Sequence, residues 1–266
     1  VTCRKMQKKE EKVYSALLVI IYLAFISLGL PDTLLGSAWP QMHIELNASL
    51  SSAGIITMII SLGTVISSLF SDRLNIKLGT GKVTAISVLM TAVALLGFSL
   101  SHSFIILCVL AVPYGLGAGA VDAALNNYVA LHYSSKHMSW LHCFWGVGAS
   151  IGPYIIGTCM AHGLGWRGGY SVISVLQFTL TAALFITLPL WKKVENSENN
   201  VSNGNNERTQ EEPQERKAKS LSEVLHIKGV IYILFAFFCY SAVEQTTTLW
   251  CASYLVLNRS IDSNTA

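Results

Sequence analysis

Seven long apolar runs separated by polar segments dominate the hydrophobic pattern of this chain. The runs are 13–38, 51–70, 83–101, 104–131, 138–161, 170–191 and 229–257. An α-helix needs about 20 largely apolar residues to cross the hydrocarbon core of a bilayer, and each run meets or approaches that length. The pattern therefore predicts an all-α, polytopic membrane protein with seven transmembrane helices and the lipid bilayer as its surroundings.

Composition and charge support a membrane protein and add an orientation. Hydrophobic residues make up 52% of the chain and charged residues 12%, against about 25% charged residues in soluble domains. The net charge of +3 does not indicate a nucleic-acid partner, because Lys and Arg gather in the N-terminal tail and in alternate loops. The intervening connections 39–50 and 99–103 contain neither Lys nor Arg. The exceptions to this alternation are Arg167, in the connection 162–169, and Arg259, after the last run. Positive-inside bias then predicts a cytoplasmic N-terminus, and we expect the cell membrane as the location.

The runs divide the chain into five parts. These are a basic cytoplasmic tail (1–12), a six-helix bundle (13–191), a cytoplasmic central loop (192–228), a seventh helix (229–257) and a short end (258–266). The central loop is rich in Asn, Glu, Gln and Lys, so we expect disorder or loose helix, followed by a short amphipathic helix capped by Ser220 or Ser222.

The stretch GLPDTLLGSAWP, at the end of the first run, places Asp32 directly after Pro31. An acid inside hydrocarbon costs roughly 2.5 kcal/mol or more, which makes it a candidate functional residue. If Trp39 and Pro40 mark the outer interface, Asp32 lies within the span and faces a cavity; the alternative is a solvated helix end. Pro31 also frees a backbone carbonyl one turn earlier, which water or a neighbouring helix must satisfy.

Two further acids lie inside apolar runs. Asp122 shares a helical stripe with Asn126, and Glu244 is followed by Gln245. Each acid is either a packing residue hydrogen-bonded to a neighbouring helix or a binding group for substrate and proton. The apolar runs offer these acids no evident Lys or Arg partner. Without such a partner, desolvation should make their protonation accessible near physiological pH, which a proton-coupled carrier requires.

The fifth run adds candidate pocket residues and a possible repeat. His142 and Trp145 share a face, and aromatic, amide and carboxylate groups together suit sugar hydroxyls; the histidine is either a proton relay or a structural residue. The segments GTVISSLFS and GASIGPYIIG, at Gly63 and Gly148, share small residues, as inverted three-helix repeats would or as helix packing alone requires.

GLGAGAVD lies inside an apolar run, so it is not a nucleotide loop, and we expect no enzyme, no cofactor and no metal site. The cysteines lack metal-ligand spacing and are expected to act as small hydrophobes.

The residues resemble those of the major facilitator superfamily. SDRLNIKLGTGK resembles its loop motif, with Asp72, Arg73 and Lys77 matching and Ser68 replacing a glycine, and GASIGP resembles its fifth-helix motif. The resemblance implies a bundle of 3+3 inverted repeats plus a seventh helix, truncated from twelve. It also implies a gate formed by the three loop residues, and missing C-terminal helices that a complete carrier needs.

More narrowly, GLPDTLLGSAWP, GLGAGAVDAALNNYVA and YSAVEQTTTLWCASYL resemble fucose permease-like sugar:proton symporters. That resemblance implies proton coupling and sugar binding by Asp32 and Asp122. We therefore expect a secondary transporter that moves a sugar or similar small polar solute by alternating access together with protons. The alternatives are a drug or metabolite exporter on the same fold and a membrane scaffold without transport.

Overall fold

The computed structural model describes residues 2–205, 223, 225–263 and 265, and α-helices are the only regular secondary structure in these ranges. The helices are α1 (Thr2–Asp32), α2 (Leu34–Glu45), α3 (Ser52–Leu78), α4 (Thr80–Leu100), α5 (Phe104–His132), α6 (Ser135–Ala161), α7 (Gly165–Asn205) and α9 (Val230–Arg259). Seven spans in this part of the chain are long and apolar enough to cross a membrane, with α1 and α2 together forming the first. The predicted all-α polytopic fold is confirmed.

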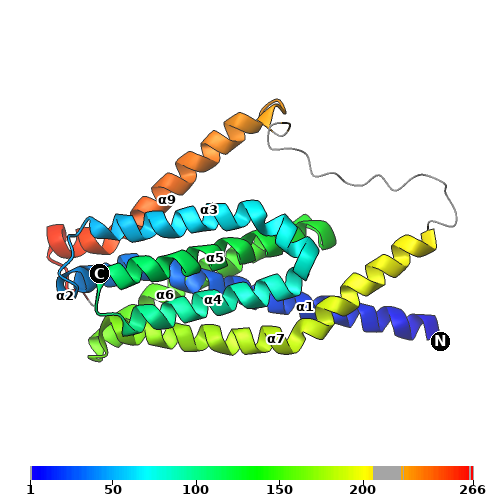
Figure 1. Cartoon of the computed structure of the whole chain (residues 1–266), viewed down its shortest axis with the longest axis horizontal. Coiled ribbons are helices and arrows are strands. Elements are labelled where there is room, and N and C mark those ends of the chain that lie inside the picture. Colours follow the sequence, from blue (N-terminus) through cyan, green and yellow to red (C-terminus); the bar gives the residue numbers. More distant parts are fainter. Residues whose placement is uncertain (1, 206–222, 224, 264, 266) are drawn as a thin grey trace.

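The first six spans form one bundle, and the seventh leans away from it (Figure 1). The most extensive packing joins α3 to α5, α4 to α7, α1 to α6 and α4 to α5. Helix α9 packs mainly along α2, and its first ten residues are largely exposed. The bundle therefore holds most of the tertiary contacts, while α9 is attached mainly through α2.

Glycines bring the bundle helices into backbone contact. A methyl group at Gly29 or Gly148 would clash with a carbonyl across the α1–α6 contact, and one at Gly115 or Gly119 would clash across α3–α5. Small residues at such contacts let helices approach closely in lipid, where packing drives association. The first and fifth spans are thus paired in the same way as the fourth and second, as two inverted three-helix repeats would be.

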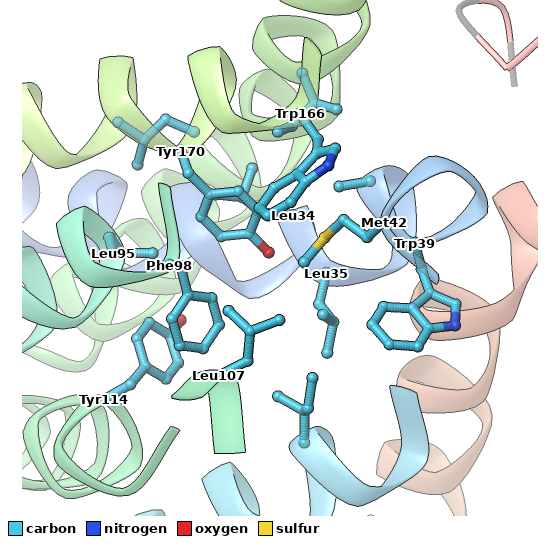
Figure 2. Packing of buried hydrophobic residues seen from close by; sticks show 14 of the residues in the cluster. Leu34, Leu35, Trp39, Met42, Leu95, Phe98, Leu107, Tyr114, Trp166 and Tyr170 are labelled. Atoms are coloured by element: carbon cyan, nitrogen blue, oxygen red, sulfur yellow. The ribbon is translucent and has the colours of Figure 1, made fainter. Parts of the chain in front are cut away.

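Two clusters of buried side chains fill the bundle. One lies among α2, α4, α5 and α7, where Phe98 packs against Tyr170 and Tyr114, and Trp166 lies close to Tyr170 (Figure 2). The other extends along residues 17–28 of α1, with Leu17, Ile21, Phe25, Leu125, Leu141 and Trp191 among its members. The candidate acids lie along the helices that these clusters hold together.

The connection expected after the first run is partly helical. Helix α2 continues to Glu45, so much of the expected connection 39–50 is helical. Trp39 is fully buried and donates its indole N–H to the carbonyl of Leu50 at 2.7 Å. It is a packing residue rather than an interfacial anchor, because α2 turns its side chain into the bundle.

Part of the predicted central loop is helical. Helix α7 continues through Asn205, because residues 190–203 contain no proline or glycine to end it. Val194 is buried against the second cluster, which supports the first turn beyond the apolar run. Helix α1 likewise begins at Thr2 and includes the basic tail. Residues 206–222, with the proposed caps Ser220 and Ser222, lie outside the described residues.

Candidate functional site

The first span is interrupted next to its acid. Helix α1 ends at Asp32 and α2 begins at Leu34, with Thr33 between them and Pro31 in the last turn of α1. Because α2 adds 12 residues to the apolar helical segment Tyr14–Glu45, Asp32 lies within that segment rather than at its end. The proline, which lacks an N–H group, explains why the helix is interrupted at this point.

Neighbouring helices satisfy two of the carbonyls that prolines free. Pro31 leaves the carbonyl of Ser27 without its intrahelical donor, and Gln177 of α7 donates to it from Nε2 at 2.6 Å. In return the Ser27 hydroxyl donates to Oε1 of Gln177, and both side chains are buried. Pro153 of α6 leaves the carbonyl of Ala149, which accepts a hydrogen bond from Thr33 Oγ1 at 3.0 Å. Of the two partners expected for the carbonyl that Pro31 frees, water or a neighbouring helix, the structure shows the neighbouring helix α7.

Both carboxylate oxygens of Asp32 have donors on other helices. Tyr114 of α5 donates its hydroxyl to Oδ1 at 3.2 Å, and Trp145 of α6 donates its indole N–H to Oδ2 at 2.9 Å. Tyr114 is buried and Trp145 half-buried, whereas the side chain of Asp32 is exposed. Neutral donors thus fix the carboxylate on an open face, with no cation in contact in the described part of the chain.

The second acid pairs with its predicted amide. Asn126 Nδ2 donates to Oδ1 and to the backbone carbonyl of Asp122, both at 3.0 Å, while Asn127 points outward and is exposed. His142 of α6 lies within electrostatic reach of Asp122. It is exposed and meets the ring of Phe25 edge-on, with centroids 6.1 Å apart. Asp122 therefore has a hydrogen-bonded amide on its own helix and an ionisable histidine near it on α6.

The third acid lies near the first. Asp122 and Glu244 are both within electrostatic reach of Asp32, so the acids of the first, fourth and seventh spans are gathered in one region. Glu244 is half-buried, and Gln245 beside it is exposed. Neither side chain makes a hydrogen bond to another described residue. Their grouping with Asp32 results from the packing of α9 on α2.

The predicted gate residues lie apart from the acids. Asp72, Arg73 and Lys77 are exposed near the end of α3, and no ion pair joins them to the rest of the described chain. Arg73 lies 6.0 Å from the ring centroid of Phe70. Ser68, which stands where the motif has glycine, donates its hydroxyl to the carbonyl of Gly119 at 3.2 Å and so links α3 to α5.

The glycines around Asp32 bring neighbouring helices into contact. Gly29 contacts the backbone of α6 at Trp145, and Gly36 contacts the backbone of α9 at Thr248. Both glycines are therefore occupied by helix packing. No group of three or more His, Cys, Asp or Glu side chains among the described residues could hold a metal ion. The free thiols are Cys108, Cys143, Cys159, Cys239 and Cys251.

Sequence reasoning missed three residues of this site. Tyr114, Gln177 and Thr33 supply hydrogen bonds to Asp32 or to the helix breaks beside it. A signal existed for Gln177, since it is the one amide within the apolar run 170–191 and such residues commonly bond across membrane helices. Nothing in the sequence separates Tyr114 and Thr33 from other tyrosines and threonines.

These features define a polytopic helical membrane protein with acids from separate spans gathered in one region. The sequence profile of the Major Facilitator Superfamily matches residues 21–263. The match covers most of the chain, which therefore belongs to this superfamily.

Several curated proteins are similar to the chain at low identity. The uncharacterized transporter y4wD of Sinorhizobium fredii is 26% identical over 42% of this chain and 31% of its own length. Synaptic vesicle glycoprotein 2B of Rattus norvegicus is 25% identical over 65% of this chain and 26% of its own length. The hexuronate transporter of Bacillus subtilis is 21% identical over 92% of this chain and 57% of its own length. The chain thus spans between about a quarter and three fifths of these relatives.

Proposed function

We propose that this protein is a secondary transporter that moves a sugar or a similar small polar solute by alternating access, coupled to protons. The observation that carries the proposal is the carboxylate of Asp32, held inside a membrane span by Tyr114 and Trp145 on an open face. An ionisable group in such a position is the usual mark of a substrate or proton pathway. Membership of the Major Facilitator Superfamily supports the same reading.

The donors around Asp32 support proton coupling. Tyr114 and Trp145 are neutral and can hydrogen-bond either protonation state of the carboxyl group, so a proton can arrive or leave without breaking an ion pair. Asp122, with Asn126 at 3.0 Å and His142 nearby, offers a second exchange point, and Glu244 a third. In this proposal the three acids share the proton and solute between them.

The polar groups support a hydroxylated solute. Carboxylate and amide groups of Asp32, Asp122, Asn126 and Gln245 can hydrogen-bond to hydroxyls, and the half-buried ring of Trp145 offers a flat apolar face. A hexuronate transporter among the relatives carries a polar sugar acid by its name, which is the same chemical class. The closer likeness to fucose permease-like symporters, the cell-membrane location and the cytoplasmic N-terminus remain predictions.

The test measures solute-driven proton movement in sealed proteoliposomes. The protein would contain residues 1–266 and any helices that its gene encodes beyond them, and a panel of hexoses, deoxyhexoses, hexuronates and small drugs would be added outside. We expect external alkalinisation with at least one sugar, which Asp32→Asn abolishes and Asn127→Ala, at an exposed position outside the site, leaves intact. A correctly inserted protein that moves no proton with any sugar would overturn the proposal. Drug-driven acidification would instead favour an exporter, and no response at all a scaffold.

A further inference from the structure

Gln177 of α7 hydrogen-bonds to the Ser27 carbonyl that Pro31 frees, one turn before Asp32, and the proposed function assigns this contact no role. The two hydrogen bonds between Gln177 and Ser27 are buried inside the bundle, five residues before Asp32 in the chain. We propose that Gln177 is a positioning residue, which holds the carbonyl freed by Pro31 and thereby sets the Asp32 carboxylate against Trp145. The proposal rests on the role of Asp32 in the proposed function.

The geometry of the break requires such a partner. In an α-helix the carbonyl of Ser27 would accept from the N–H of residue 31, and proline has none. A buried carbonyl left unpaired costs about 1–3 kcal/mol, and water is scarce inside a membrane bundle. Gln177 Nε2 takes the place of the missing donor at 2.6 Å. The interruption of the first span is thus stabilised from α7.

The same side chain lies close to Tyr114, one of the two donors of Asp32. Gln177, Ser27, Pro31 and Tyr114 line one small internal cavity between α1, α4, α5 and α7. On the other side of Asp32, Thr33 donates to the carbonyl of Ala149. Asp32 is therefore flanked by two cross-helix bonds, one to α7 and one to α6, and each satisfies a carbonyl that a proline has freed.

A simpler role for Gln177 makes a different prediction. If the side chain only joins α7 to α1, its loss costs the same whether or not residue 31 is a proline. If it acts through the freed carbonyl of Ser27, its effect depends on Pro31, because Pro31→Ala restores the missing N–H group. The dependence between the two positions therefore separates positioning from general packing.

The experiment reads the Asp32–Trp145 bond directly. The full chain would be labelled with 5-fluorotryptophan, the ¹⁹F resonance of Trp145 assigned with Trp145→Phe, and its displacement by Asp32→Asn recorded as the signature of a broken bond. We expect Gln177→Met to move the resonance toward the Asp32→Asn position. Ser27→Ala, which keeps the backbone carbonyl, should leave the resonance near its wild-type position. In the Pro31→Ala background we expect Gln177→Met to cause no further displacement.

Two outcomes would overturn the proposal. One is a Trp145 resonance that stays at its wild-type position in Gln177→Met while Asp32→Asn moves it. The other is an equal displacement by Gln177→Met with and without Pro31. Should Gln177→Met fail to fold, Gln177→Asn replaces it, because it shortens the side chain but keeps the amide. We expect this variant to displace the Trp145 resonance less, in the same direction. An undisplaced resonance in Gln177→Asn would count equally against the proposal. Because the resonance needs no transport, a displaced Trp145 in a protein that carries no solute would refute the proposed function alone.

Discussion

At the scale of single residues, the environment of Asp32 distinguishes it from the other acids. Its two oxygens have donors on two different helices, whereas Asp122 is bonded by Asn126 on its own helix. Glu244 makes no hydrogen bond to another described residue, although it is half-buried. Asp32 is therefore the acid whose position is best fixed by tertiary structure. We expect substitution of its donors to affect solute binding more than substitution around the other two acids.

Removing the indole donor should weaken solute binding. Trp145→Phe deletes the 2.9 Å bond to Asp32 Oδ2 but keeps an aromatic ring. Hydrogen bonds to charged groups contribute about 1.5–3 kcal/mol, so we expect the apparent KM for the transported solute to rise about tenfold to a hundredfold, measured by radiolabelled uptake. Trp140→Phe is the matched control on the same helix, since that ring is exposed. An equal rise in both variants would contradict the assigned role of Trp145.

At the scale of elements, prolines and glycines shape the helices around the site. Pro31 and Pro153 interrupt hydrogen bonding in α1 and α6, and polar side chains of neighbouring helices restore it. Gly29 and Gly148 let the same two helices approach until their backbones touch. The α1–α6 pair is thus close-packed near Asp32, which explains how Trp145 can reach the carboxylate.

Two glycines of α6 should respond differently to the same substitution. A methyl group at Gly148 would meet the Ile26 carbonyl, whereas Gly146 has no neighbouring atom within 4 Å of the added carbon. We expect Gly148→Ala to lower the free energy of unfolding by about 1–3 kcal/mol, the usual cost of overpacking. Gly146→Ala should be neutral or slightly stabilising, because alanine favours helix over glycine. Thermal unfolding in detergent would measure both, and equal losses would argue against a close α1–α6 contact.

At the scale of the whole molecule, a polar cluster joins three separate parts of the bundle at one end. Arg167 at the start of α7 forms an ion pair with Glu45 at the end of α2 and donates to the carbonyl of Ser101. Trp166 donates to the same Glu45 carboxylate at 3.0 Å and lies 4.2 Å from the Arg167 guanidinium. Arg167, an exception to the charge distribution in the sequence, therefore has a structural explanation.

Loss of this polar cluster should lower the stability of the whole bundle. Exposed ion pairs contribute little alone, but Arg167 also donates to a backbone carbonyl and stacks on an indole. We expect Arg167→Met to lower the free energy of unfolding by about 1–2 kcal/mol, measured by thermal unfolding at low and high salt. Lys136→Met, at an exposed lysine, is the control and should have almost no effect. Identical unfolding of the two variants would show that the cluster does not stabilise the bundle.

The sequence by itself determined the number of spans, the all-α class and the three membrane acids. These follow from local properties, since any sufficiently apolar run must form a helix in lipid and any acid within it is costly. The carbonyl freed by Pro31 was equally predictable, because it depends only on the missing N–H group.

Only the tertiary structure decided which groups meet. Tyr114, Trp145 and Gln177 reach the first span from three other helices, and no local pattern specifies that approach. It also decided that α2 extends past Trp39 and buries it, since the bundle supplies the contacts that an isolated run lacks. Hydropathy acts along a helix, whereas a site depends on distances between helices, and those are set by the packing of small residues and the hydrogen bonds that cross them.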